Sequence, residues 1–215
     1  MSTKVTKRTL KRVVLPTMES NEDASATLEV VPSTALPKEG FDVSFAQGKR
    51  LVLSTFNGKV LIHVREYMLE GEREFPTKKG VCFTPGRLSV LRRKIGEIDE
   101  ALRQQEINAS YNVTYDGVTL SYKAHLGGGI YASVNGKYFG VNLRRYWIPE
   151  GQQEIIPTKN GIYLPKSQWS ALKRKIEDLL IAHPELVDAQ GCISSHDGQL
   201  EAMECRECMP FGWMI

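Results

Sequence analysis

Cationic and aromatic side chains alternate with apolar ones along residues 56–68, which read FNGKVLIHVREYM. Successive side chains of a β-strand point to opposite faces, so Lys59, Arg65 and Tyr67 share one face and the intervening valines and isoleucine share the other. A basic and aromatic sheet face suits single-stranded nucleic acid, because Lys and Arg neutralise phosphates while rings stack on unpaired bases. An ordinary solvated strand face is the commoner explanation of a single strand of this kind.

A second stretch repeats this pattern about eighty residues later, where residues 135–147 read NGKYFGVNLRRYW. It again carries a Lys, an Arg and a Tyr, here Lys137, Arg144 and Tyr146, and the recurrence strengthens the prediction of a nucleic-acid site. The second copy has one more residue between Asn-Gly-Lys and Arg-x-Tyr. That residue moves Lys137 to the other face unless a bulge absorbs it.

Near the end of the sequence, Cys192, His196, Cys205 and Cys208 form a C-x3-H-x8-C-x2-C pattern. Thiolates and imidazole are ligands of tetrahedral zinc, and Cys-x2-Cys pairs are common in such sites. The interval between the two pairs is short and matches no familiar zinc signature, which favours a flexible acidic tail with free thiols. We therefore predict no cofactor and keep these four residues as candidate zinc ligands.

The remaining motifs do not indicate catalysis. The four histidines have no Ser or Cys nucleophile at a spacing typical of a catalytic pair. The glycine run that ends at Gly129 is not followed by the Gly-Lys-Ser/Thr of a phosphate-binding loop. We predict a binding protein that is not an enzyme.

The net charge of +3 conceals a segregated distribution, because the two repeats are basic while residues 187–215 carry one Arg against five acidic residues. No apolar run is long enough to cross a bilayer, and the N-terminal MSTKVTKRTLKR lacks the apolar core of a secretory signal. We therefore expect an intracellular protein with no membrane partner. Its four cysteines should be reduced or metal-bound.

Two segments with the same order of elements surround these motifs. Residues 41–83 contain four short β-rich runs, and the next segment has apolar residues at helical spacing, at Leu88, Leu91, Ile95, Ile98 and Leu102. A second set of β-rich runs precedes a helical pattern formed by Trp169, Leu172, Ile176 and Leu179. The predicted fold class is α+β, with two tandem ββββα modules. Units of about 60 residues are marginal alone, so we expect the two modules to share a core.

We expect four regions along the chain. They are a disordered arm at residues 1–40, basic and then Ser/Glu-rich; a first module at residues 41–105; a linker and second module at residues 106–186; and an acidic, Cys-containing tail at residues 187–215. The basic KVTKRTLKR segment of the arm fits a nuclear-import signal or a DNA tether, and a solvated charged arm explains it equally well.

In combination, FNGKVLIHVREYM, the PTKKG turn, VCF and the helix ending in KIGEIDEAL resemble the C-terminal domain of the positive cofactor four family of single-stranded-DNA-binding transcriptional coactivators. The second copy is similar mainly in NGK, LRRYW, NGIYL and QWSALKRKI. The resemblance implies a twisted four-stranded antiparallel sheet plus one helix in each module. Because the family builds its site from two chains, it also implies an intramolecular pseudo-dimer of the two modules.

By position, the resemblance assigns DNA contacts to Phe56, Lys59, Arg65, Lys78 and Lys79 in the first copy and to Lys137, Arg144, Trp147 and Lys159 in the second. Tyr67 and Tyr146 complete the predicted nucleic-acid-binding set. Two departures are Met68, where the family has an aromatic residue, and Asn160, where it has a basic one. We expect Trp147 to compensate for Met68, and Phe56 to compensate for Val134, its apparent counterpart.

The leading prediction is single-stranded DNA binding by a composite groove, in a transcriptional coactivator or a replication or repair accessory protein. Predicted partners are single-stranded or locally opened DNA, with RNA and transcription or replication proteins as further candidates. We expect a nuclear protein that is a monomer with pseudo-two-fold symmetry. The alternative is a protein-interaction scaffold whose sheet faces no longer bind nucleic acid.

Overall fold

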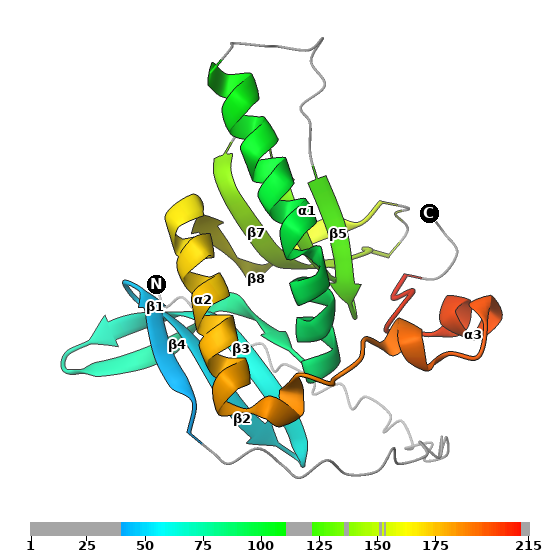
Figure 1. The fold of residues 1–215 in the computed structure, drawn as a ribbon, viewed down its shortest axis with the longest axis horizontal. Coiled ribbons are helices and arrows are strands. Elements are labelled where there is room, and N and C mark those ends of the chain that lie inside the picture. The colour runs from blue at the N-terminus through cyan, green and yellow to red at the C-terminus, as the bar shows by residue number, and fades with distance from the viewer. Residues whose placement is uncertain (1–39, 111–121, 136–137, 151, 153, 212–215) are drawn as a thin grey trace, which may run out of the picture. The chain divides into compact units, whose positions relative to one another are not determined.

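The computed structural model describes residues 40–110, 122–135, 138–150, 152 and 154–211 (Figure 1). The predicted arm up to residue 39, Lys137 and the apolar end after Phe211 lie outside these ranges. All described residues belong to one compact unit. Within them, no helix is both long enough and apolar enough to cross a membrane.

Two four-stranded antiparallel sheets form, and each is followed by a helix, which confirms the α+β class with two ββββα modules. The first module comprises β1 (Asp42–Ala46), β2 (Lys49–Phe56), β3 (Lys59–Glu70), β4 (Arg73–Phe83) and α1 (Pro85–Ser110). The second comprises β5 (Tyr122–Gly127), β6 (Ile130–Asn135), β7 (Tyr138–Trp147), β8 (Ile156–Pro165) and α2 (Lys166–Ala182). The tail contains η1 (Pro184–Leu186), η2 (Cys192–Ser195) and α3 (Gln199–Glu204). In each sheet the strands lie in chain order.

Local sequence explains where the first module turns. Asn57 and Gly58 both have positive φ, 49° and 71°, as a two-residue hairpin turn requires, and Asn-Gly is the preferred pair for it. Helix α1 begins after Thr84, whose hydroxyl accepts a hydrogen bond from the Arg87 N–H at 3.3 Å. The helix runs to Ser110, beyond the boundary expected at residue 105.

The two modules bury one continuous core, as their small size predicts. Helix α1 packs against β3 and β4 and also lies against β5, β6 and β7 of the second sheet, while α2 contacts β1 and β2 of the first (Figure 1). The core therefore mixes residues of both modules, among them Leu51, Ile62, Leu91, Leu143 and Trp169. Each helix therefore covers apolar surface on both sheets.

One polar contact between the helices satisfies a buried donor. The Trp169 side chain is 1% exposed, and its Nε1 donates a hydrogen bond to Asp99 Oδ1 at 2.7 Å. The other carboxylate oxygen of Asp99 pairs with Lys173. Asp99 lies on α1 whereas Trp169 and Lys173 lie on α2, so this contact fixes the position of one module's helix against the other's.

Asp99→Ala should therefore lower the free energy of unfolding by about 1–3 kcal/mol, because the buried Trp169 N–H loses its acceptor. Urea unfolding measures the change. Glu100→Ala on the same helix is the control, since among the described residues Glu100 bonds within its own helix, to Arg103 and Gln104. Equal losses in the two variants would contradict a structural role for the Asp99–Trp169 contact.

Candidate nucleic-acid interface

Strand β3 separates its side chains as the sequence predicts. Ile62 and Val64 are buried in the core, while Arg65 and Tyr67 lie on the outward face of the first sheet. On β2, Arg50 pairs directly with Arg65 and therefore lies on the same face. This outward face is the surface on which most of the predicted contacts of the first module lie.

A bulge between β3 and β4 orients Arg65. The register shifts between Arg65, which pairs with Gly80, and Tyr67, which pairs with Pro76. Within the bulge, the Thr77 hydroxyl donates to the Glu66 carbonyl at 2.8 Å and accepts from the Lys79 N–H at 3.1 Å. The carbonyl of Thr77 in turn accepts a hydrogen bond from Arg65 Nη1 at 2.6 Å. The bulge thus holds the Arg65 guanidinium against the Thr77 carbonyl.

The second module repeats this arrangement bond for bond. Arg144 Nη1 donates to the Thr158 carbonyl at 2.6 Å, and the Thr158 hydroxyl donates to the Arg145 carbonyl at 2.8 Å. The same hydroxyl accepts from the Asn160 N–H at 3.1 Å. The recurring sequences PTKKG and PTKNG therefore form the same bulge, and in each copy it positions the arginine of the preceding strand. We call this unit the arginine bulge.

A glycine completes each arginine bulge. A Cβ atom at Gly80 would lie 2.7 Å from the Val64 carbonyl oxygen and 2.8 Å from the Arg65 Cα. At Gly161 it would lie 2.8 Å from both Cβ and Cγ of Arg144. The space that a side chain would fill is therefore occupied by the arginine strand, and only glycine permits that close approach.

The bulge lysines differ in their pairing. Lys78 and Lys159 are exposed and form no ion pair within the described part of the chain. Lys79 is also exposed, but its Nζ pairs with Glu66 Oε1 at 3.0 Å. Asn160 occupies the position of Lys79 in the second module. Lys79, one of the predicted DNA contacts of the first copy, is thus partly neutralised by Glu66.

The two outward faces differ most beside the tyrosines. In the first module Arg50 lies 5.5 Å from the centre of the Tyr67 ring and is paired with Asp42 and Glu74. These contacts raise the pKa of Arg50, chiefly through its hydrogen bonds to Asp42 and then Glu74.

In the second module Lys123 takes the position of Asp42, since the two residues pair with equivalent positions of the neighbouring strand. Its Nζ lies 4.0 Å from the centre of the Tyr146 ring and 4.9 Å from that of Tyr131. Partial burial lowers the pKa of Lys123. The second face therefore has Lys123 beside two tyrosine rings where the first face has Arg50 in salt bridges. Lys123 has no carboxylate partner among the described ion pairs, so its positive charge is less neutralised than that of Arg50.

The exposed aromatic residues lie near the ends of the hairpins. Phe56 is 66% exposed and Trp147 49%, which leaves both rings available for stacking. Met68 pairs across the strand with Phe75, whose ring is also exposed. The first module therefore has an aromatic ring beside Met68 that sequence reasoning missed, because Phe75 lies on the following strand.

The second hairpin corrects one sequence-based equivalence. Val134 pairs with Val141, whereas the next residue, Asn135, pairs with Tyr138, so a bulge absorbs the extra residue. Val134 is 1% exposed and faces the core, while Phe56 ends β2 opposite Lys59. The matching of Phe56 with Val134 is therefore wrong, because the two hairpins differ in length. Lys137 lies outside the described residues.

Two grooves follow from these arrangements. One, of about 440 Å³, lies between the modules and brings together the cations Arg65, Lys78, Arg87 and Arg145, with Asn160 beside them. The other, of about 450 Å³, lies on the second face and is lined by Arg144, Tyr146, Lys159 and Tyr163. Sequence reasoning missed Arg87 and Arg145, because Arg87 comes from a helix and Arg145 faces away from Arg144 along β7.

The histidines on the outward faces add little positive charge. Burial, and then Arg65, lower the pKa of His63, whose Nε2 lies 3.0 Å from the Ser54 hydroxyl. Burial also lowers the pKa of His125, which Glu207 raises in part. Both imidazoles are therefore neutral at pH 7, and arginine and lysine provide the cationic character of the surface.

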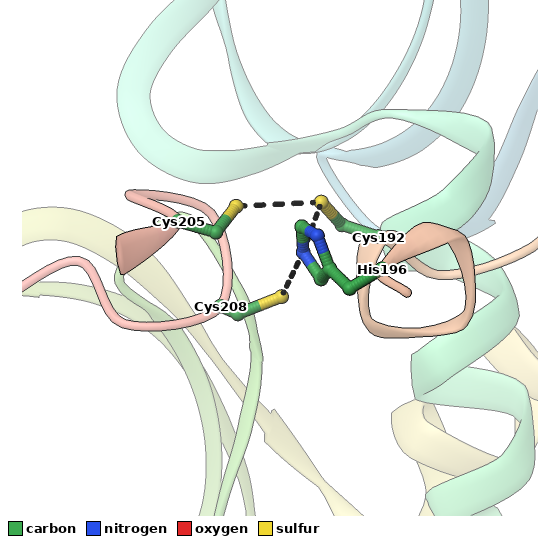
Figure 2. Close-up of side chains that lie close together, drawn as sticks. All are labelled: Cys192, His196, Cys205 and Cys208. Carbon is green, nitrogen blue, oxygen red and sulfur yellow. Dashed lines mark hydrogen bonds between the residues drawn. The ribbon is translucent and has the colours of Figure 1, made fainter. Parts of the chain in front are cut away.

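A cluster of metal-ligand residues lies in the tail. The ligand atoms of Cys192, His196, Cys205 and Cys208 all lie within 4.8 Å of one another. Figure 2 shows the four side chains directed toward a common point. The sequence identified these residues, but their approach depends on how η2 and α3 fold.

Comparison with known proteins connects the first module to a family. The family model described as Transcriptional Coactivator p15 (PC4) matches residues 46–94, which extend from the end of β1 into α1. The chain is 31% identical over 58 residues to the RNA polymerase II transcriptional coactivator KELP of Arabidopsis thaliana, covering 27% of this chain and 35% of that protein. It is 25% identical over 92 residues to KIWI, an RNA polymerase II transcriptional coactivator of the same plant, covering 40% and 86%.

A putative RNA polymerase II transcriptional coactivator of Caenorhabditis elegans is 40% identical over 52 residues, covering 23% of this chain and 41% of that protein. The matched segment thus spans about a third of the first relative's length and less than half of the third's. The second module lies outside the range that the family model matches.

The glycines of the arginine bulges provide a test of this geometry. Gly80→Ala and Gly161→Ala should each lower the free energy of unfolding by about 1–3 kcal/mol, because the new methyl group overlaps the arginine strand. Gly96→Ala in α1 is the control: nothing lies within 4 Å of its Cβ position, so it should stabilise the helix by about 0.5–1 kcal/mol. Thermal unfolding followed by circular dichroism distinguishes these outcomes, and tolerance of alanine at both bulges would refute the close approach.

Proposed function

We propose that this protein is a non-enzymatic transcriptional coactivator that binds single-stranded DNA across its two outward sheet faces. The observation that supports this most directly is the duplicated arginine bulge. Arg65 is held in the module that matches the coactivator family, and Arg144 is held by the same hydrogen bonds in a module that the family model does not match. The same hydrogen bonds are present in a second module whose sequence has diverged. This favours a binding role that the two modules share.

The chemistry of the bulge fits phosphate binding. A guanidinium presents five N–H donors in a planar fork, and the bond to the threonine carbonyl uses only part of that fork. The anchored arginine loses little conformational freedom on binding, so its remaining donors meet an anion at low entropic cost. Lys78 and Lys159, exposed beside the arginines, add charge along the path of a nucleic-acid backbone.

The distribution of rings and charges favours a single strand over a duplex. Phe56, Phe75 and Trp147 are exposed, and Phe56 pairs directly with Lys59 across the hairpin. Exposed rings stack on bases that have no partner, with about 1–3 kcal/mol per base. The groove between the modules joins Arg65 of the first arginine bulge to Asn160 of the second. We therefore propose one continuous site per chain and a monomeric protein with pseudo-two-fold symmetry, in place of a site shared by two chains.

The names of the relatives support a role in transcription. Three proteins named as RNA polymerase II transcriptional coactivators, one of them as putative, are 25–40% identical to segments of this chain, so we propose a nuclear location and contact with the transcription machinery. RNA is a competing ligand in this proposal, since phosphates and bases are common to both nucleic acids. The alternative is a protein-interaction scaffold that does not bind nucleic acid, and the following measurement distinguishes the two.

Fluorescence anisotropy with labelled oligo-dT across a salt series tests the proposal. The affinity should fall with salt, and Arg65→Ala with Arg144→Ala should weaken binding and reduce the salt slope by about 1.4, or about 0.7 for each lost phosphate contact with a single strand. Lys175→Ala is the control, because Lys175 pairs with Asp178 on α2, away from the strands. Unchanged affinity in the double arginine variant, or no binding by the wild type, would leave the scaffold as the better explanation.

The unequal charges of the two faces give a second test. Glu66→Gln should strengthen oligo-dT binding and steepen the salt slope by about 0.7, because Lys79 loses its internal partner. Lys123→Gln should weaken binding and flatten the slope by about 0.7, because it removes one cation of the second face. The same anisotropy titration measures both. Changes of the same sign in the two variants would contradict the assignment of these charges to the binding surface.

A further inference from the structure

The tail cluster has the geometry of a tetrahedral metal site. Cys192 Sγ lies 3.5 Å from both His196 Nε2 and Cys205 Sγ, and Cys208 Sγ lies 3.3 Å from His196 Nε2 (Figure 2). Two thiolates bound to zinc at about 2.3 Å lie about 3.8 Å apart along a tetrahedral edge. The sulfur atoms of a disulfide lie about 2.05 Å apart. The observed separations are close to the zinc edges and far from a disulfide.

We propose that Cys192, His196, Cys205 and Cys208 bind one structural zinc ion, and that this ion holds the tail as a clamp across both modules. On binding, the three thiols release their protons to solvent and the imidazole coordinates as the neutral ring. Three thiolates and one imidazole complete a four-coordinate Cys₃His set, which leaves no open position for substrate. The ion is therefore structural.

The surroundings of His196 fit this coordination. Its Nε2 faces the sulfur atoms of Cys192 and Cys208, which leaves Nδ1 on the other side of the ring. There the nearest Glu201 carboxylate oxygen lies 3.7 Å from Nδ1. A carboxylate beside the free nitrogen of a metal-bound histidine orients the ring and raises its basicity. Glu201 Oε2 also accepts a hydrogen bond from the Asp197 N–H at 3.0 Å, which fixes its position.

The backbone of the tail already brings the cysteines together. The Cys205 N–H donates to the Glu201 carbonyl at 3.0 Å, and the Met209 N–H donates to the Cys205 carbonyl at 2.7 Å. These bonds close the turn of the Cys-x2-Cys pair at the end of α3. On the other side, the Ser195 hydroxyl donates to the Cys192 carbonyl at 2.7 Å. Neither η2 nor α3 contains a buried residue, so a metal ion is a suitable source of stability for this segment.

The position of the cluster supports the clamp. Glu207 lies between Cys205 and Cys208 in sequence, and its carboxylate forms a two-pronged ion pair with Arg87 on α1 of the first module. Its backbone carbonyl accepts the Gly128 N–H at 2.8 Å, in the β5–β6 turn of the second module. One residue held by the metal loop therefore contacts both modules. Arg87 also lines the groove between them, so the clamp borders the proposed nucleic-acid site.

Cobalt substitution of the full-length wild-type protein tests the metal directly. Protein purified with zinc should contain about one zinc ion per chain, and cobalt-loaded protein should show thiolate-to-cobalt charge-transfer and tetrahedral ligand-field bands. Cys205→Ser with Cys208→Ser should abolish both signals. Cys82→Ser, on β4 and outside the cluster, should leave them intact. Absent zinc, an octahedral cobalt spectrum or a metal-free Cys192–Cys205 disulfide would overturn the site.

The carboxylate provides a finer variant that keeps all four ligands. Glu201→Ala should weaken zinc binding about tenfold, as loss of a partner of a metal-bound histidine does. Glu204→Ala on the same helix is the matched control, because Glu204 is exposed and does not approach the cluster among the described contacts. Competition against a chromogenic chelator measures both affinities. Equal affinities would overturn the role assigned to Glu201 while the cobalt spectrum still decides the site itself.

Hydrogen–deuterium exchange then tests the clamp without nucleic acid, so its outcome is independent of the proposed function. Removal of zinc should abolish the protection of the Gly128 amide, whose acceptor is the Glu207 carbonyl. Amides paired between β2 and β3 serve as the internal control and should not change. If a zinc-bound protein loses its metal with no change at Gly128, the clamp is wrong even though the metal site is correct.

Discussion

The structure depends on one apolar core that the two ββββα modules share, because units of this size bury little surface by themselves. A sheet of four strands presents one apolar face, and a single helix leaves part of that face uncovered. Here α1 extends across β5, β6 and β7, and α2 reaches β1 and β2, so one core serves both sheets. The outward faces are fixed in relation to each other by that core, and the proposed groove between Arg65 and Arg145 exists only because the modules are packed together.

Sequence was sufficient for the parts of this fold that depend on local periodicity. The alternation along β3 and the apolar spacing of α1 and α2 are visible within one element, and the repeated order of elements revealed the two modules. The outward position of Arg65 followed from the same alternation. Its orientation did not, because it depends on a bulge in which the Thr77 hydroxyl replaces missing ladder bonds and Gly80 leaves room for the arginine strand. The motif was recognised in the sequence, but its structural role was not.

What sequence missed depends on contacts between distant residues. Arg87 and Lys123 joined the candidate surface, and the ring of Phe75 was found beside Met68, only once strand pairing and the packing of the modules were known. The error at Val134 has the same origin, since aligning two hairpins by their motifs assumes arms of equal length. The tail shows the opposite case. Its ligand types were plain in the sequence, but their spacing did not show that η2 and α3 bring the four side chains together.

Joining two modules in one chain also removes a constraint that identical subunits impose. In a symmetric dimer any substitution appears twice, whereas here Asp42 and Lys123 occupy equivalent positions with opposite charge. The first face holds Arg50 in salt bridges, and the second surrounds Lys123 with two tyrosines. Because the two halves of the groove carry different charges, a bound strand meets these charges in one order in one orientation and in the reverse order in the other. The fused arrangement therefore gives the proposed site a means to distinguish the polarity of a bound strand, which a symmetric site lacks.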